Sequence, residues 1–228
     1  MVDLMEKKIL AIIPAFNEGQ KIKSVIEETL KFLPVLVVDD GSTDQTAILS
    51  EAAGARVIRQ NPNQGKGAAL LAGFEYALKL CYDAVLTLDA DGQHDPQEIP
   101  LFLHQYAKES CDLIIGSRDF FKMPLIRRIA NTWGEKAFSW ALRQPIRDNQ
   151  SGYRLISSRL MNSVLASKER GFEFEVEMIV ICAEKKFKMD WVPIQTIYAD
   201  EKSHIKPISH LVNFIRVIVQ TRKRTKLL

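Results

Sequence analysis

Two aspartates one residue apart follow a run of apolar residues in the segment LTLDADGQHD. Leu86 and Leu88 indicate the end of a buried strand, so Asp89 and Asp91 fall where that strand meets solvent. Carboxylates this close repel each other, and a divalent cation such as Mg2+ or Mn2+ offsets the repulsion because hard cations prefer oxygen ligands. Taken alone, the D-x-D pattern is short, and a polar turn after a strand is the commoner explanation.

Polar residues follow two earlier apolar runs in the same way. The first run ends in IPAFNE, which puts Glu18 at the strand end after a proline that interrupts strand hydrogen bonding. The second ends in VVDDGSTD, where Asp40 can accept hydrogen bonds from a nucleobase or a ribose. A capped turn explains the glycine and serine, but not Asp39 and Asp40 together on an apolar strand without visible local compensation of their charge.

Two further segments complete the row of strand ends. The loop NPNQGKG opens a helix, whose free N–H groups favour anions, and it places Lys66 near a ligand or simply at a helix start. The segment GSR ends another apolar run at Arg118. A row of polar clusters at ligand-binding positions predicts a nucleotide and metal site rather than a series of ordinary turns.

The elements that must position these residues alternate along the chain. Apolar runs bounded by turn residues occur at KILAIIPAF, LPVLVVDD, ARVIRQ, AVLTLD and CDLIIGSR, and segments of helical period separate them. Such alternation predicts an α/β fold with a mostly parallel sheet covered by helices on both faces. The expected helices and late elements are a helix at 43–53, a helix at 67–80, a helix at 96–108, a strand at 189–198 and a C-terminal helix at 210–221.

The bulk properties exclude several classes of protein. The chain has 228 residues, 46% of them hydrophobic, which suits one well-packed domain and excludes a disordered chain. A net charge of +3 is no general signature of nucleic-acid binding. The three cysteines, Cys81, Cys111 and Cys182, lack CxxC spacing and are expected to be reduced core thiols of a cytosolic protein. We expect no signal peptide and no membrane-spanning segment, because the N-terminus is charged and no apolar run reaches about 20 residues.

The combination IPAFNE, VVDDGSTD, NQGKGAAL, DADGQH, GSR and DNQSGYR resembles family 2 glycosyltransferases of the GT-A fold, in particular the polyprenyl-phosphate sugar transferases typified by dolichyl-phosphate mannose synthase. The resemblance implies a GT-A (Rossmann-like) catalytic domain at 1–206, followed by a C-terminal helix and basic tail at 207–228. It also implies a metal-dependent, inverting transfer of a hexose, mannose or glucose, from a GDP- or UDP-linked donor to a dolichyl or undecaprenyl phosphate.

The resemblance also assigns roles to individual residues. It implies a metal site of Asp89, Asp91 and Gln93 that takes Mg2+ or Mn2+, and catalytic roles for Asp91, Arg118 and Arg154. Phosphate contacts are expected from Ser151, Lys202 and His204, although His204 stands where the family often has a lysine. The donor-binding residues implied are Pro14, Phe16, Glu18, Asp40, Lys66, Asp89, Ala90 and Arg118.

A lipid phosphate is already an anion, so the implied acceptor needs no strong general base. If the acceptor were a hydroxyl, Glu175 and Glu177 would become base candidates, and a solvated helix face explains them equally well. His94 is expected either to line the metal site or to be a turn residue.

The acceptor implied by the resemblance would place the protein at a membrane, and the sequence offers two segments for that contact. The C-terminal stretch LVNFIRVIVQTRKRTKLL has an apolar stripe followed by basic residues, which suits peripheral contact with anionic lipid on the cytoplasmic face, or an ordinary docking helix. The stretch Pro124 to Leu142, with Trp133 and Trp140, is equally consistent with a second interfacial element or a helix packed on the sheet.

Two alternatives come from other functional classes. LTLDADG resembles the aspartate motif of haloacid-dehalogenase-like phosphatases, but that motif usually lies on the first strand, and three strands precede it here. A non-catalytic nucleotide-sugar binding module would be expected to have a broken metal site, whereas Asp89, Asp91 and Gln93 are all present. No nucleic-acid partner is expected.

Overall fold

The computed structural model describes residues 7–118, 125–171 and 173–195, together with residues 216, 218, 219, 221, 222 and 224. Between 125 and 131 it describes the backbone only. The expected domain boundary at 206/207 and most of the expected helix at 210–221 lie outside the described residues, as do Lys202 and His204.

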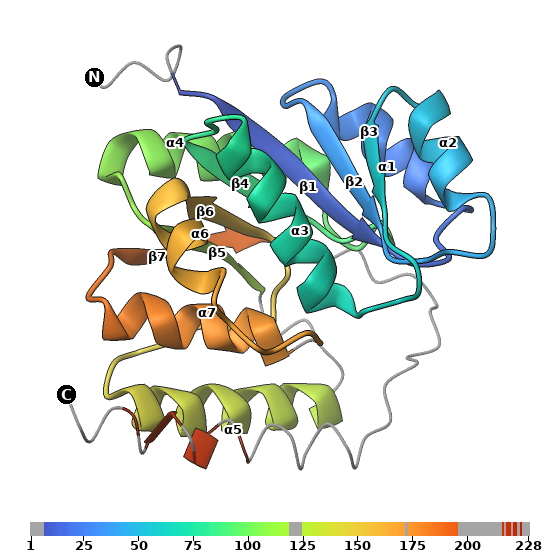
Figure 1. Ribbon diagram of the computed structural model, residues 1–228. Coiled ribbons are helices and arrows are strands. Elements are labelled where there is room, and N and C mark those ends of the chain that lie inside the picture. Colours follow the sequence, from blue (N-terminus) through green and yellow to red (C-terminus); the bar gives the residue numbers. More distant parts are fainter. Residues whose placement is uncertain are drawn as a thin grey trace.

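The described part of the chain is a sheet flanked by helices (Figure 1). The strands are β1 (Ile9–Ala15), β2 (Val35–Asp39), β3 (Arg56–Arg59), β4 (Ala84–Thr87), β5 (Leu113–Arg118), β6 (Arg154–Ser157) and β7 (Met189–Ile194). The helices are α1 (Ile22–Thr29), α2 (Thr46–Ala52), α3 (Lys66–Lys79), the 3-10 turn η2 (Pro96–Glu98), α4 (Ile99–Glu109), α5 (Leu125–Leu142), α6 (Ser158–Val164) and α7 (Glu173–Glu184).

The strands form one seven-stranded sheet in the order β3-β2-β1-β4-β6-β5-β7. Every described pair is parallel except those of β6, which runs antiparallel to both β4 and β5. The mostly parallel α/β fold expected from the sequence is therefore confirmed. The reversal of β6 has a local consequence: its first residue, Arg154, pairs with Thr87 at the end of β4, so the segment before β6 lies at the carboxyl edge of the sheet.

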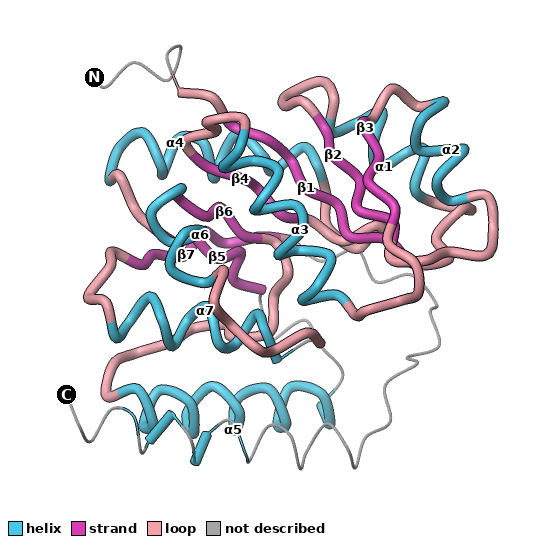
Figure 2. Tube along the Cα trace, in the orientation of Figure 1, coloured by secondary structure: helices cyan, strands magenta, loops and turns pink. Residues whose placement is uncertain are grey.

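The long apolar strands are buried because helices cover both faces of the sheet. Alternate β1 side chains face opposite cores: Leu10 and Ile12 pack in one cluster with side chains of α3, α6 and α7, and Ile9 and Ile13 pack in the other with side chains of α1 and α4. Figure 2 shows loops following β1 and β2 on the same side of the sheet. Side chains carried by those loops are thereby brought together.

Two described elements, β6 and α6, lie where the sequence pattern predicts none, and α7 lies where a helix is only one of two explanations for Glu175 and Glu177. In addition, the prediction of three core thiols is wrong for Cys81, which is exposed, whereas Cys111 and Cys182 are buried. Burial raises the pKa of the Cys111 thiol to about 11 and that of Cys182 to about 12, so both stay protonated at neutral pH.

The described C-terminal residues are helical and dock against the protein. Arg224 forms ion pairs with Glu184 at 2.6 Å and Glu177 at 3.0 Å, both on α7. The Arg222 guanidinium lies 4.5 Å from the ring centre of Trp140 on α5, and Thr221 is buried. These two arginines of the basic tail therefore contact protein, which favours the docking-helix explanation of this segment over the membrane anchor. Along the described chain, no helix has the length and apolar composition needed to cross a bilayer.

Candidate active site

A cavity of about 490 Å³ opens at the carboxyl ends of β1, β2 and β4. It lies where open parallel sheets bind their ligands, and residues from four separate strand ends and loops form its wall. The predicted donor-site residues that line it are Pro14, Phe16, Glu18, Asp40, Lys66, Asp89, Ala90 and Asp91.

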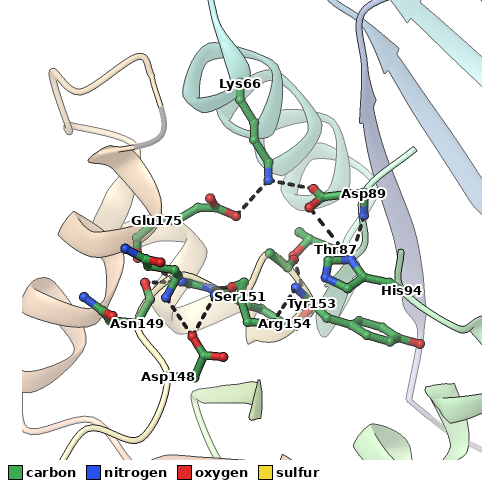
Figure 3. Close-up of polar contacts among 12 residues, drawn as sticks. Lys66, Thr87, Asp89, His94, Asp148, Asn149, Ser151, Tyr153, Arg154 and Glu175 are labelled. Carbon is green, nitrogen blue, oxygen red and sulfur yellow. Dashed lines mark hydrogen bonds and ion pairs between the residues drawn. The ribbon is translucent and has the colours of Figure 1, made fainter. Parts of the chain in front are cut away.

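Two residues that line this cavity, Lys66 and Asp89, form an ion-paired cluster with Glu175 (Figure 3). Lys66, the first residue of α3, places its Nζ 2.6 Å from Asp89 Oδ1 and 3.2 Å from Glu175 Oε1. Burial opposes the charge on Asp89, but Lys66 more than offsets this effect and lowers the Asp89 pKa to about 2. Asp89 is therefore ionised throughout the neutral range. The alternative that Glu175 lies on a solvated helix face is wrong, because it is 5% exposed and paired with Lys66.

The second aspartate of the motif, Asp91, lies at the cavity surface. Asp91 lines the cavity, and its Oδ1 accepts a hydrogen bond from the Gln93 backbone N–H at 2.9 Å. His94, expected as a metal-site or turn residue, is instead buried, and its Nδ1 accepts the Asp89 backbone N–H at 3.1 Å. Burial lowers the pKa of His94, which keeps the ring neutral and able to accept this bond. His94 thus supports the backbone of the motif.

The pKa of Glu18 reflects its burial and the negative charges at the cavity wall. Burial raises its pKa, and the negative charges of Asp91 and Asp89 raise it further. Three carboxylates therefore contribute negative potential to one wall of the cavity, which is the environment a cation prefers.

The oxygen ligands available at this wall fit a divalent cation that binds together with a diphosphate. Among the described residues, no group of three His, Cys, Asp or Glu side chains is arranged to hold a metal ion by itself. Asp89 and Asp91 can supply one or two carboxylates, and Mg2+ sites in nucleotide-dependent enzymes commonly combine such a pair with substrate phosphates and water. Gln93 is not among the residues that line the described cavity.

Asp40 organises the loop that forms the cavity's side. Its two carboxylate oxygens accept the backbone N–H groups of Gln64 at 2.8 Å and Gly65 at 2.7 Å. Gly65 has a φ of +96°, and a side chain there would meet the Arg170 carbonyl, so the loop requires glycine at this turn. Asp40 lines the cavity, but part of its hydrogen-bonding capacity is used by this loop.

The negative charges of the adjacent aspartates at the end of β2 are compensated, contrary to the expectation from the sequence. Asp39 is fully buried and pairs with Arg59 Nε at 3.1 Å, and it also accepts the Ser42 backbone N–H at 3.0 Å. Asp40 has the loop N–H groups described above. The two aspartates therefore help to build the strand end and its loop, and Asp40 also lines the cavity.

A second polar cluster lies in the segment before β6. Asp148, 1% exposed, receives Arg118 in a two-bond fork, with Nε at 2.7 Å and Nη2 at 3.1 Å from its oxygens. Asp148 also accepts the backbone N–H groups of Gln150 and Ser151. Ser151, expected as a phosphate contact, is buried, and its Oγ accepts the Tyr153 N–H at 3.4 Å.

Arg154 has a structural set of contacts. It is 1% exposed, and its guanidinium donates to the carbonyl oxygens of Ser151 at 2.7 Å, Asn149 at 3.1 Å and Glu175. These bonds join the segment before β6 to the start of α7. The described contacts thus favour a positioning role for Arg154 over the catalytic role expected from the sequence.

The sequence did not single out two residues of the site, nor the pairing of a third. Asp148 is one: it lies in the quoted DNQSGYR segment, and an aspartate followed by small polar residues is typical of a side-chain-capped turn. Gly152 is another, because its Cα faces the Lys66–Asp89 pair. The role of Glu175 as the second partner of Lys66 is the third. A signal for that pairing is the lysine itself, since a cation in the first turn of a helix is unfavourable unless acidic partners surround it.

Comparisons with known proteins agree with this geometry. The sequence model of the family described as "Glycosyl transferase family 2" matches residues 10–165. The UDP-N-acetylglucosamine–dolichyl-phosphate N-acetylglucosaminyltransferase of Methanococcus voltae is 30% identical over 86% of this chain and 88% of its own length. The undecaprenyl-phosphate mannosyltransferase of Micrococcus luteus is 30% identical over 82% of both chains.

Solved structures share the fold. Glucosyl-3-phosphoglycerate synthase from Mycobacterium tuberculosis, in complex with uridine diphosphate, superimposes with a TM-score of 0.77 over 96% of this chain and 81% of its own chain. At 20% identity, this likeness concerns the architecture.

Proposed function

We propose that this chain, which belongs to glycosyl transferase family 2, moves a hexose from a UDP- or GDP-linked donor to a polyprenyl phosphate. The observation that carries the proposal is the cavity at the strand ends, which Asp40, Lys66, Asp89 and Asp91 all line. Its curated relatives include polyprenyl-phosphate sugar transferases.

The donor would lie across the strand ends. Phe16, which is 47% exposed, would stack on the nucleobase. Asp40 lines the same cavity, and its carboxylate could accept a hydrogen bond from the base or the ribose. Asp89 and Asp91 would hold Mg2+ or Mn2+. When bound, that cation neutralises the charge that develops on the departing nucleoside diphosphate.

The acceptor would need little activation, because a phosphate monoester oxygen is already anionic near neutral pH. Attack on the anomeric carbon from the side opposite the diphosphate would invert its configuration, in line with the resemblance. Arg118, fixed by Asp148, would orient the acceptor phosphate, and Lys202 and His204 remain proposed phosphate contacts. Glu175 is a poor candidate for the base that a hydroxyl acceptor requires, because it is buried and its carboxylate is already paired with Lys66.

A thermal-shift panel tests the donor half of the proposal. UDP- and GDP-sugars, each with and without Mn2+, should give one donor that raises Tm by several degrees only with the metal, since ligand at a hundred times Kd stabilises by about 2.7 kcal/mol. Polyprenyl phosphate and the labelled donor should then yield a solvent-extractable labelled lipid. The absence of a shift with every donor would contradict the proposal.

Helix α5 offers a better membrane contact than the basic tail. Trp133 and Trp140 are 73% and 61% exposed, and Lys136 is exposed between them at helical spacing, so one face combines interfacial aromatics with positive charge. Figure 1 shows α5 along the lower edge of the molecule. We therefore assign peripheral contact on the cytoplasmic face to this helix.

Vesicle binding tests the assignment. Phosphatidylcholine vesicles with 30% phosphatidylglycerol should retain the protein better than phosphatidylcholine alone, and the double variant Trp133→Ala/Trp140→Ala should weaken that binding about tenfold. Ile48→Ala is the matched control, because Ile48 is 66% exposed on α2. Equal losses in both variants would overturn the assignment to α5.

A further inference from the structure

The position of Lys66 is unusual for a residue beside a cation site. Its Nζ lies between the Asp89 and Glu175 carboxylates, at 2.6 and 3.2 Å, and the Lys66 side chain is 16% exposed (Figure 3). A fixed positive charge therefore already neutralises the first aspartate of the metal-binding motif. Any divalent cation that uses the same carboxylate must approach that ammonium group.

The wall behind the ion pair leaves no room for Lys66 to withdraw in that direction. A Cβ added to Gly152 would lie 2.9 Å from Lys66 Nζ and 2.9 Å from Asp89 Oδ2. The Gly152 carbonyl accepts a hydrogen bond from the Thr87 hydroxyl at 2.8 Å, which fixes the position of this residue. The pair thus fits closely against the segment before β6, and the ammonium faces Glu175 and the cavity on its other sides.

Glu175 is fixed independently of Lys66. Its backbone carbonyl accepts a hydrogen bond from Arg154, and its side chain is 7% exposed. A buried carboxylate on a fixed backbone can retain the lysine after Asp89 is lost as a partner. It would keep Lys66 at the cavity, where the ammonium can meet an anion.

We propose that Lys66 is an internal competitor of the divalent cation: it occupies Asp89 in the free protein and gives it up when a nucleoside diphosphate binds, with Glu175 as the positioning residue that holds it. The negative charge of the diphosphate attracts both the Lys66 ammonium and the metal. The repulsion between these two cations is therefore offset only when protein, metal and nucleotide are together. The cation and the nucleotide would consequently strengthen each other's binding by the same factor. This inference rests on the proposed function for its nucleotide and on the ion-paired cluster for the competition.

Mn2+ binding, followed by the electron paramagnetic resonance signal of the free ion, tests the proposal without any transfer reaction. Wild-type protein should bind Mn2+ weakly alone and about tenfold more tightly with UDP or GDP. Lys66→Met should tighten Mn2+ binding without nucleotide and reduce the enhancement by nucleotide to the part that comes from direct ligation of the metal by the phosphates. Unchanged or weaker Mn2+ binding in Lys66→Met, with the enhancement retained, would overturn the proposal.

The role of Glu175 is tested by a double-mutant comparison. Glu175→Gln should weaken Mn2+ binding more than Glu177→Gln, which removes the same charge two residues along α7 from a carboxylate paired with Arg224. In the Lys66→Met background the two substitutions should become equal, because the difference acts through the lysine. A difference that persists in that background would overturn the positioning role.

These results also separate the inference from the proposed function. If neither UDP nor GDP binds, the donor assignment fails, yet the gain in Mn2+ affinity of Lys66→Met still supports the competition at Asp89. If Lys66→Met is unfolded by circular dichroism, the comparison of Glu175→Gln with Glu177→Gln in the otherwise wild-type protein decides. No Mn2+ binding to any variant would refute the inference.

Discussion

Asp91→Asn is expected to lower the rate of sugar transfer about a thousandfold, because the lost charge is one that holds the cation opposite the departing diphosphate. The fold should be unaffected. Asparagine keeps an oxygen that can accept the Gln93 backbone N–H, which is the contact Asp91 makes in the structure. The rate is measured as labelled sugar transferred to polyprenyl phosphate under saturating donor and Mn2+, and Tm by calorimetry.

Asp95→Asn provides the matched control for this result. Asp95 lies four residues on in the same loop, caps η2 by accepting the Gln97 N–H at 2.9 Å, and is not among the residues lining the cavity. Its substitution should change transfer less than about twofold, since asparagine caps helix starts equally well. Transfer by Asp91→Asn within tenfold of wild type would contradict the metal assignment.

Among the substitutions described, Arg154→Met is expected to lower the free energy of unfolding most. The variant leaves three buried carbonyl oxygens, those of Asn149, Ser151 and Glu175, without their charged donor. Each buried acceptor left unsatisfied costs about 1–3 kcal/mol, so the free energy of unfolding, measured by urea denaturation, should fall by about 3 kcal/mol or more. Because Arg154 also fixes the backbone of Glu175, donor-dependent stabilisation should decrease as well.

Arg147→Met is the control for arginine at an exposed position in the same segment. Its loss should change the free energy of unfolding by less than about 0.5 kcal/mol, as expected for a surface substitution. If the two variants are equally stable, the guanidinium of Arg154 does not join the segment before β6 to α7 in the way described.

The first half of the fold follows from the sequence because its signals are local. The β1 and β2 segments are continuous apolar runs, which parallel strands buried on both faces require, and each ends in polar residues at the same edge. For that reason the amino-acid sequence alone is enough to predict that Glu18, Asp40 and Asp89 share one site. Their gathering in one cavity needs only the parallel arrangement.

The second half depends on tertiary context that a single sequence does not display. The strand β6 has four residues, and nothing in RLIS reveals that it runs antiparallel. The helix α7 is buried along much of its length, including Phe174, Val176 and Ile179, so its apolar residues do not mark one face. Asp148 and the pairing of Glu175 with Lys66 were missed for this reason, because the paths of β6 and α7 bring them to the site.

The reversed strand makes the long stretch between β5 and β6 a closed excursion from one edge of the sheet. The chain leaves the sheet's ligand-binding edge at Arg118 and returns to the same edge at Arg154, on adjacent strands that pair through Ile115 and Arg154. Residues of this stretch that contact neither the core, as Phe138 and Ile146 do, nor Arg118, as Asp148 does, can be exchanged without shifting the register of any strand. A chimera that takes only the exposed face of α5 from a relative would therefore keep this protein's donor cavity and change the surface presented to the acceptor.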